Sequence, residues 1–344
     1  METRYWKAPS GYLNTASFGI PSERSQSAIR QTLKTWETGE LAFGGWLTQA
    51  LETRASIAQI TNAPSSWVAL GSSTAPMLGS IAAALPDGAQ ILAPTNEHNS
   101  NLIPYLNQAH RGIWIKSVPL HEIVDHISHD TALVSCSAVQ SLTGAVADIK
   151  GIREATRRTG TLFALDLSQA CGWLPVKSLD ADILVCSVYK WLCSPIGGAF
   201  LVMNPELSRK LRPVTPGWVT GREVMAAPYG TDFQGVEETR RFDTVPNLIS
   251  MISLKAAIED LLSVGLDDIQ VHNVCLANRF RELMDLEPSN SAIVTMRWPG
   301  ANEHLLRRGV RATEWQGNLR LAFHIYNSES DADEAASVLR TLRA

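Results

Sequence analysis

The sequence predicts an α/β fold: a large domain built on a mostly parallel sheet covered by helices, followed by a smaller α+β domain. Three observations support this prediction. Short, nearly continuous apolar runs recur through the first part of the chain, patterns of period 3.6 lie between most of them, and the character of the chain changes after about Asn204. Apolar strands that alternate with helices are typical of a parallel sheet buried on both faces.

Seven apolar runs are expected to form the sheet of the large domain. In chain order they are 67–70, 90–94, 112–118, 131–136, 161–166, 182–187 and 198–203. After the first run comes Gly71-Ser72-Ser73-Thr74, and a helical pattern then continues to Ala84. A seven-stranded, mostly parallel sheet flanked by helices follows from this alternation.

The last third of the chain predicts a second, smaller unit. A stretch rich in Pro, Gly and charges, 213–246, separates it from the sheet. The patterns beyond predict helices at 248–264, 266–286, 303–308 and 331–343, and strands at 291–298 and 318–326. We expect residues 15–246 to form the large domain, and residues 1–14 together with 247–344 to form the small one.

Composition excludes several classes of protein. The chain has 344 residues, of which 45% are hydrophobic and 19% charged, as expected for a folded globular protein. A formal net charge of −4 gives no electrostatic footprint for nucleic acid or an anionic membrane. The longest apolar run, 183–203, is interrupted by Lys190, which disfavours a membrane span. The first residues lack the apolar core of a signal peptide, so we expect a cytoplasmic protein.

Cysteines and histidines do not form a metal-binding pattern. The five cysteines are scattered without a CxxC pair, and four of them lie in apolar segments where buried thiols are expected. The three histidines of segment 121–129 do not have the HExxH spacing, and a solvated helix near a loop is the simpler interpretation. No metal is therefore expected.

Polar residues follow the ends of several predicted strands, where ligands collect in α/β sheets. Ser72 and Ser73 open a helix whose free N–H groups suit a phosphate, although an ordinary helix cap is the better explanation of these residues taken alone. Asp166 ends one strand, and a helix cap is its alternative role. Lys190 follows the next strand between apolar residues, which lowers its pKa and favours a neutral, imine-forming amine. A lysine that extends from the strand end to solvent is the alternative.

Together these groups provide a phosphate cradle, a carboxylate and an amine at one edge of the sheet. Pyridoxal phosphate needs these three: a lysine for the Schiff base, an acid on the pyridine nitrogen, and donors for the phosphate.

Several segments in addition resemble a known family. Ala164-Leu165-Asp166-Leu167-Ser168-Gln169-Ala170, followed by Ser187-Val188-Tyr189-Lys190, is similar to the class V aminotransferase family, which includes the cysteine desulfurases and consists of fold-type I pyridoxal-phosphate enzymes. Further segments that resemble the family, in the right order, are 12–17, 96–101, 141–144, 241–247 and 318–327. The resemblance implies a fold-type I enzyme with pyridoxal 5'-phosphate as its cofactor.

The resemblance assigns roles around the cofactor ring. Lys190 would form the Schiff base and carry the proton at Cα, and Asp166 would pair with the pyridinium nitrogen. His98 would stack on the ring, and Gln169 would donate a hydrogen bond to the phenolic oxygen. Ser141 stands where the family usually has Asn, so its contact to the ring oxygen, or a substitute contact from Gln140, stays open.

It also implies a phosphate site, a substrate site and a homodimer. Ser72, Ser73, Ser187 and Tyr189 would bind the phosphate, and Tyr189 stands where many relatives have His. Thr244 and Asn247 would reach the phosphate of the neighbouring subunit. Arg320 would grip the substrate carboxylate, and the remaining candidates for substrate binding are Asn14, Ser17, Arg311 and Trp218. We expect Trp173 and Trp191, in contrast, to be core residues.

One departure from the family bears on the reaction. Cysteine desulfurases carry a nucleophilic cysteine just after the segment that corresponds to 310–313, and this chain has none there. We therefore expect β-elimination, such as C–S lysis of a cysteine conjugate, because elimination needs a base and an electron sink but no thiol. An aminotransferase or amino-acid epimerase is the alternative, and a binding protein on a catalytically retired scaffold is a third interpretation.

Overall fold

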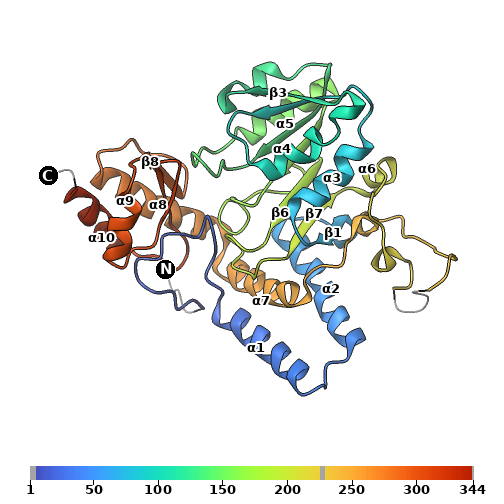
Figure 1. Ribbon diagram of the computed structural model, residues 1–344, viewed down its shortest axis with the longest axis horizontal. Helices are drawn as coiled ribbons and strands as arrows, with labels where there is room; N and C mark the ends of the chain where they lie inside the picture. Colours follow the sequence, from blue (N-terminus) through green and yellow to red (C-terminus); the bar gives the residue numbers. More distant parts are fainter. Residues whose placement is uncertain (1–4, 225–228, 343–344) are drawn as a thin grey trace.

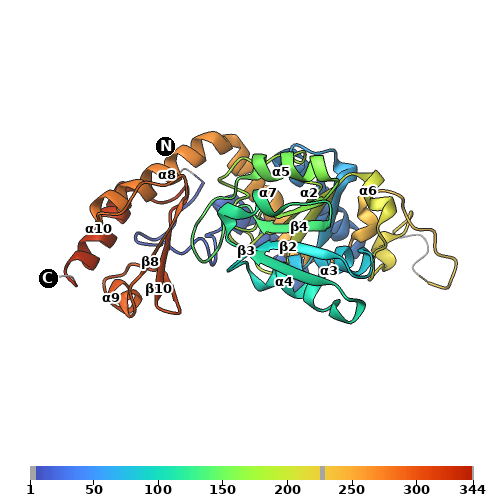
Figure 2. The ribbon, with the colours of Figure 1, turned by 90° about the horizontal axis from the view of Figure 1, so that it is seen from above.

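The computed structural model describes residues 5–224 and 229–342. A large α/β body lies beside a smaller C-terminal unit, and the long helices α7 and α8 run from one to the other (Figures 1 and 2). This two-part architecture agrees with the predicted fold class, whereas the residue limits of the two domains stay a prediction.

A seven-stranded sheet forms the centre of the large body, as predicted. Its strands are β1 (Val68–Gly71), β2 (Gln90–Pro94), β3 (Trp114–Val118), β4 (Thr131–Ser137), β5 (Leu162–Asp166), β6 (Ile183–Ser187) and β7 (Ala199–Met203). The spatial order is β1-β7-β6-β5-β4-β2-β3. Neighbours from β3 to β6 run parallel, while β7 is antiparallel to both β6 and β1. The carboxyl ends of β4, β5 and β6 therefore lie side by side.

Helices cover both faces of the sheet, which explains why its central strands are continuously apolar. Every residue of β6 and β7 is buried. Figure 2 shows α2 (Phe43–Ile60), α5 (Ile149–Thr159) and α7 (Leu248–Val264) on one face, and α3 (Thr74–Ala84) and α4 (Asn99–Leu106) on the other. Two separate clusters of buried side chains, one on each face, form the core of the body.

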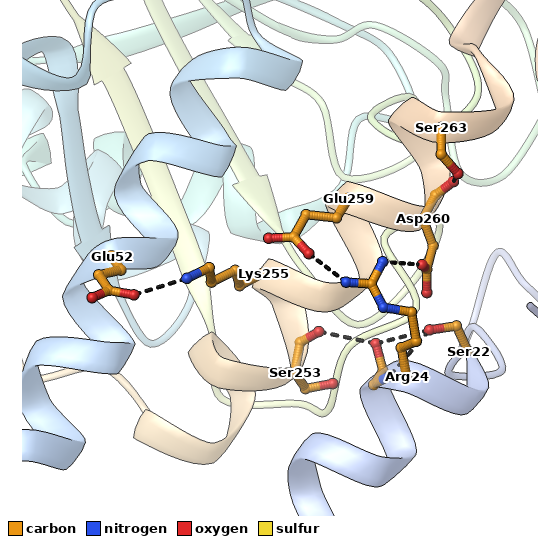
Figure 3. A network of polar contacts seen from close by, with 9 residues as sticks. Ser22, Arg24, Glu52, Ser253, Lys255, Glu259, Asp260 and Ser263 are labelled. Atoms are coloured by element: carbon orange, nitrogen blue, oxygen red, sulfur yellow. Dashed lines mark hydrogen bonds and ion pairs between the residues drawn. The ribbon is translucent and has the colours of Figure 1, made fainter.

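Helix α7 also anchors the first helix, α1 (Glu23–Glu37). Figure 3 shows Arg24 of α1 between two carboxylates of α7: its Nη1 lies 2.7 Å from Asp260 Oδ1 and its Nη2 lies 2.7 Å from Glu259 Oε2. On the other side of α7, Lys255 Nζ lies 2.8 Å from Glu52 Oε2 of α2. Helices α1 and α2 are thus both fastened to α7.

The small unit has its own sheet and core. It contains α8 (Leu266–Leu283), β8 (Ile293–Arg297), α9 (Ala301–Arg307), β9 (Thr313–Trp315), β10 (Asn318–Ala322) and α10 (Glu329–Arg340), and its antiparallel sheet has the order β8-β10-β9. Isolated bridges join Tyr12 to Arg311 and Asn14 to Ala322, so the N-terminal segment packs on this unit.

The remaining short helices connect these elements. They are α6 (Pro205–Lys210) and 3-10 helices at Ser65–Trp67, Ala109–Arg111, Leu120–Glu122, Val124–His126, Trp218–Thr220 and Thr239–Phe242. The prediction of a solvated helix within 121–129 is therefore wrong, since the segment forms two short 3-10 turns. It lacks an apolar face long enough to hold an α-helix on the core.

Two further findings concern predicted features. Cys136, Cys171, Cys186 and Cys193 are buried and Cys275 is exposed, which confirms the four buried thiols. Within residues 5–224 and 229–342, no helix is long and apolar enough to cross a membrane.

Candidate active site

The polar residues that follow β4, β5 and β6 line one cavity, as the parallel arrangement of these strands predicts. Its lining residues are Thr74, His98, Ser100, Ser137, Ser141, Asp166, Ser168, Gln169, Ser187, Tyr189 and Lys190. Seven of the site residues assigned from sequence are among them. The strand-end argument thus brings together the amine, the carboxylate and the amide, and the histidine, which only the resemblance to the family assigned, lies with them.

Lys190 is a buried amine on a tightly packed turn. Its Nζ has no hydrogen-bond or ion-pair partner within the described parts of the chain and lies 5.6 Å from the centre of the Tyr189 ring. Burial lowers the pKa of Lys190, Arg320 lowers it further, and the carboxylate of Asp166 opposes both. The backbone is held by Gly19, whose N–H donates to the Tyr189 carbonyl at 2.9 Å. The turn therefore presents a free amine with an increased tendency to be neutral.

Asp166 ends β5 and is buried. Its Oδ1 accepts a hydrogen bond from the Ser168 N–H at 2.7 Å, and Ser168 Oγ accepts one from the Ser187 N–H at 2.9 Å. These bonds tie the ends of β5 and β6 together and fix the carboxylate beside the amine.

His98 precedes α4 as its N-cap. Its Nδ1 accepts a hydrogen bond from the Ser100 N–H at 3.2 Å, which fixes the ring. Burial lowers the pKa of His98, and the nearby Lys190 lowers it further. The ring is therefore poised to be a neutral plane against an aromatic cofactor.

The buried carboxylate of Glu97 accepts a hydrogen bond from the backbone N–H of His98. Its Oε1 accepts from the His98 N–H at 2.7 Å and from Ser137 Oγ at 2.6 Å, and its Oε2 accepts from the Ser137 N–H at 2.8 Å. Burial raises the pKa of Glu97, and its hydrogen bonds to Ser137 oppose that rise. Glu97 thereby locks the loop after β2 onto the end of β4.

Arg320 of β10 reaches the cavity edge from the small unit. Its Nη1 donates to Ser141 Oγ at 2.7 Å and to the Ser141 carbonyl at 2.8 Å, and its Nη2 donates to Ser17 Oγ at 2.9 Å. Burial lowers the pKa of Arg320 to about 10. No carboxylate pairs with it in the described residues, so this half-buried guanidinium is available to an anionic ligand.

Asn14 and Ser17 complete this end of the site. Thr313 of β9 donates to Asn14 Oδ1, and its Oγ1 lies 3.0 Å from Ser17 Oγ. The N-terminal segment and β9 thus meet beside Arg320 of β10. The side chain of Gln140 donates to the Thr95 carbonyl at 3.0 Å and does not line the cavity. Of the two residues considered for the contact to the ring oxygen, Ser141 is therefore the one that lies at the cavity.

The beginning of α3 supplies the candidate phosphate site. Ser73 is the N-cap of α3 but its side chain makes no capping hydrogen bond, so the N–H groups of the first turn have no side-chain partner. Ser72 and Ser73 are exposed at this helix start, whereas Thr74 is buried and lines the cavity. The N–H groups and hydroxyls around Thr74 form a neutral cradle for a phosphate.

Four residues assigned from sequence lie away from the cavity. Thr244 and Asn247 are on the loop before α7, where the Thr244 N–H donates to the Leu70 carbonyl at 2.9 Å and Asn247 Oδ1 caps α7. Trp218 lines a different cavity together with Arg222, Glu223, Tyr229 and Phe233. Arg311 is exposed. Within one chain, these four residues do not contact the Lys190 cavity.

Sequence reasoning missed several residues of the site. Ser137 ends β4 and was available to the same strand-end argument that found Asp166. Glu97 and Thr313 carried no such signal, because their importance depends on contacts between segments that are distant in the chain.

The donor set fits pyridoxal phosphate. A free buried amine, a fixed carboxylate, a histidine ring and the start of α3 surround the cavity, and these are the groups that hold the aldehyde carbon, the ring nitrogen, the ring face and the phosphate.

The family model described as Aminotransferase class-V matches residues 41–300. Among curated proteins, the uncharacterised aminotransferase YcbU of Bacillus subtilis is 28% identical over 304 residues, covering 82% of this chain and 80% of its own. A probable cysteine desulfurase of Pyrococcus abyssi is 26% identical over 337 residues, covering 85% and 82%.

Solved structures share the fold at low sequence identity. The cysteine desulfurase CsdA of Escherichia coli has a TM-score of 0.83 at 20% identity, covering 97% of this chain and 95% of its own. The cystine C–S lyase C-DES has a TM-score of 0.85 at 16% identity, covering 96% and 97%. Since the family model spans most of the chain and the cavity holds the residues that the cofactor needs, this protein belongs to the class V aminotransferase family of pyridoxal-phosphate-dependent enzymes.

Proposed function

We propose that this protein is a C–S lyase that eliminates the sulfur substituent from Cβ of a cysteine derivative. The observation that carries the proposal is that the groups suited to the cofactor and to a carboxylate lie together, while no cysteine is among the described residues that line the cavity. In the described residues, the one exposed cysteine, Cys275, lies on α8, and the other four are buried.

The segment that carries the nucleophile in desulfurases is a tight hairpin in this chain. β9 and β10 are joined by Gln316 and Gly317, both with positive φ, and Trp315 pairs directly with Asn318. A two-residue turn of this kind cannot extend to deliver a side chain to a substrate. Because it also holds no cysteine, persulfide formation on the protein is disfavoured.

Bound pyridoxal phosphate supplies a ring that accepts electron density from Cα. The protein residues have separate tasks around it. Lys190 holds the cofactor and then receives the Cα proton, and Asp166 keeps the ring nitrogen protonated. Arg320 binds the substrate carboxylate with its two-pronged guanidinium. His98 packs against the ring and excludes water from that face.

The products follow from the atom balance of an elimination. Loss of the Cα proton and departure of the thiolate from Cβ with its bonding electrons leave an enamine, which water converts to pyruvate and ammonia. The thiolate takes up a proton and leaves as a thiol, or as a persulfide if the substrate is a disulfide. Water is the one co-substrate, and no acceptor of the amino group is consumed. The fold is compatible with this chemistry, since a cystine C–S lyase shares it.

An aminotransferase is the second candidate, and the relative named as an aminotransferase at 28% identity favours it. It differs from the lyase in one requirement: transamination returns the cofactor to its starting form only when a 2-oxo acid accepts the amino group. An epimerase would release neither pyruvate nor a keto acid.

The test is to incubate the cofactor-loaded protein with L-cystine, S-alkyl-L-cysteines and L-alanine, with and without 2-oxo acids. We expect pyruvate and ammonia from the cysteine derivatives alone, in equal amounts and without an acceptor. Keto acid that forms only with an acceptor would contradict the lyase and support the aminotransferase.

Lys190→Ala is the companion variant. It should abolish turnover and the adduct that borohydride traps between lysine and cofactor, because no other described amine lines the cavity. A trapped adduct that survives in Lys190→Ala would place the bond elsewhere. A wild-type protein without any trapped adduct would instead support the retired scaffold.

We also propose that the protein is cytoplasmic. We further propose that it forms a homodimer in which Thr244 and Asn247 lie near the phosphate site of the partner subunit. Three exposed apolar side chains, Phe18, Ile196 and Val245, lie on the site loops or on the loop before α7, and a partner subunit would cover them. Sedimentation of the cofactor-loaded protein tests this directly: a monomer at micromolar concentration would contradict it.

A further inference from the structure

Two buried tryptophans each donate an indole hydrogen bond to the same residue, Gln169. Trp173 Nε1 donates to the Gln169 backbone carbonyl at 2.7 Å, and Trp191 Nε1 donates to the side-chain Oε1 at 2.8 Å. Both indoles are fully buried, and their rings pack with centroids 5.4 Å apart. Only the bond from Trp191 acts on the amide that lines the active-site cavity.

The partners of the Gln169 amide determine which way it faces. An indole N–H can only donate, so Oε1 must point to Trp191. The carbonyl of Ala16 can only accept, and it receives Nε2 at 2.9 Å. Nε2 also donates to Ser141 Oγ at 3.1 Å, on the side of the cavity. Both hydrogens of Nε2 are thus engaged, and the one that faces the cavity becomes available to a bound ligand when that ligand takes the place of Ser141 Oγ. The amide therefore presents a donor to the site and not an acceptor.

Trp191 is itself held from a second side. Its backbone carbonyl accepts a hydrogen bond from His324 Nε2 at 3.0 Å, and the two rings meet edge to face with centroids 5.1 Å apart. Since Trp191 directly follows Lys190, the same short segment carries both the amine and the residue that orients the amide.

We propose that Trp191 is a positioning residue for the cofactor, which holds Gln169 so that its Nε2 donates to the phenolic oxygen of the bound ring. The inference rests on the proposed function, because it requires pyridoxal phosphate at Lys190. A donor to the phenolic oxygen stabilises its anion and competes with the proton on the nitrogen that links Lys190 to the cofactor. Trp191 thereby lowers the pKa of that linkage.

The test compares Trp191→Phe with Trp173→Phe in the cofactor-loaded protein. Both variants remove one buried indole N–H from Gln169, so they are closely matched in size and burial. The readout is the pH titration of the visible absorption band, which reports the protonation of the linkage. We expect its pKa to rise by about 0.5–1 unit in Trp191→Phe and to stay unchanged in Trp173→Phe.

Gln169→Leu completes a double-variant cycle. Alone it should raise the same pKa at least as much, and adding Trp191→Phe should then change nothing more, because Trp191 acts only through the amide. A further rise in the double variant, or an equal rise in Trp173→Phe, would overturn the inference.

Gln169→Leu also guards against a Trp191 variant that fails to fold. If it leaves the pKa of the linkage unchanged, the amide does not donate to the cofactor and the inference is wrong whatever Trp191→Phe does. These failures occur in a protein that still binds cofactor at Lys190. A wild-type protein without the visible band would instead bring down the proposed function together with the inference.

Discussion

Arg320 is the residue on which the proposed substrate class depends most directly. It lies at the edge of the cavity with two hydroxyls and a carbonyl as partners and no carboxylate among the described residues. Arg320→Lys keeps the charge but removes the two-pronged geometry, so we expect kcat/KM for the cysteine derivative to fall about 100-fold, mostly through KM.

Arg311→Lys is the matched control for this prediction. The sequence assigns Arg311 to the same carboxylate, yet its side chain is exposed. Steady-state kinetics should show less than about a twofold change. Equal losses in both variants would mean that the carboxylate binds between the two arginines rather than on Arg320.

His324 gives the stability of the protein a pH dependence. Burial lowers its pKa to about 3, whereas the unfolded chain has the ordinary value near 6.5. Below about pH 6.5 the unfolded state therefore takes up a proton that the folded state refuses, and stability falls as the pH falls toward 3. Between pH 7.5 and pH 5 the loss from this residue is about 2 kcal/mol.

His324→Gln removes the titrating group and retains an amide that can donate to the Trp191 carbonyl. Urea unfolding at pH 7.5 and at pH 5 should show a pH effect about 2 kcal/mol smaller than in the wild type. His110→Gln, at an exposed position, should leave the pH effect as it is. If the His324→Gln variant loses as much stability as the wild type, other groups cause the acid sensitivity.

At the scale of elements, the sequence predicts the large sheet well and the small sheet less well. The central strands of the large sheet are buried on both faces, so they appear as continuous apolar runs that contrast with the helices around them, whereas the edge strand β3 is partly exposed. β9 has three residues and no buried one, and it pairs only with β10. Such a strand leaves no periodic signal, and for this reason only the structure reveals it.

The turn that carries Lys190 packs closely against the backbone of Gly19, and no pattern in the sequence predicts this contact. A Cβ on Gly19 would lie 2.0 Å from the Lys190 carbonyl oxygen and 2.7 Å from Cys193 Sγ. Gly19→Ala must therefore displace this turn. We expect cofactor affinity to fall at least about tenfold and stability to fall by about 2 kcal/mol.

Gly79→Ala is the control for Gly19→Ala, because it adds a Cβ at a glycine where there is free space. Gly79 lies within α3, and a Cβ there would meet nothing within 4 Å. This variant should gain about 0.5–1 kcal/mol, because alanine favours the helix. Cofactor titration and urea unfolding of the two variants check both expectations. An unperturbed Gly19→Ala protein would show that the turn has more freedom than its packing indicates.

At the scale of the whole molecule, the site divides into a part that sequence can predict and a part that it cannot. Asp166, Ser187 and Lys190 follow neighbouring parallel strands, so topology alone brings them to one edge. Arg320 and Ser17 meet only because the N-terminal segment crosses to the small sheet. The resemblance to a family pointed to them, whereas strand patterns did not.

The segment that carries Ser17 and Gly19 leads directly into α1, so the docking of α1 on α7 holds one wall of the site. Arg24 makes that contact: it is half exposed, but its partner Asp260 is completely buried. Arg24→Ala would leave a buried carboxylate without its cation, which costs more than the loss of a surface pair. We expect a loss of about 2 kcal/mol in urea unfolding, together with weaker cofactor binding.

Lys255→Ala removes the other ion pair of α7. It is the control that separates the effect on stability from the effect on cofactor binding. Lys255 and Glu52 are both substantially exposed, so their pair should contribute less than about 1 kcal/mol, and cofactor binding should stay unchanged. Both sets of ion pairs involve α7 (Figure 3), but only the one with Arg24 includes a carboxylate that is completely buried. If Arg24→Ala loses stability without weakening cofactor binding, α1 stabilises the fold but does not hold the wall of the site.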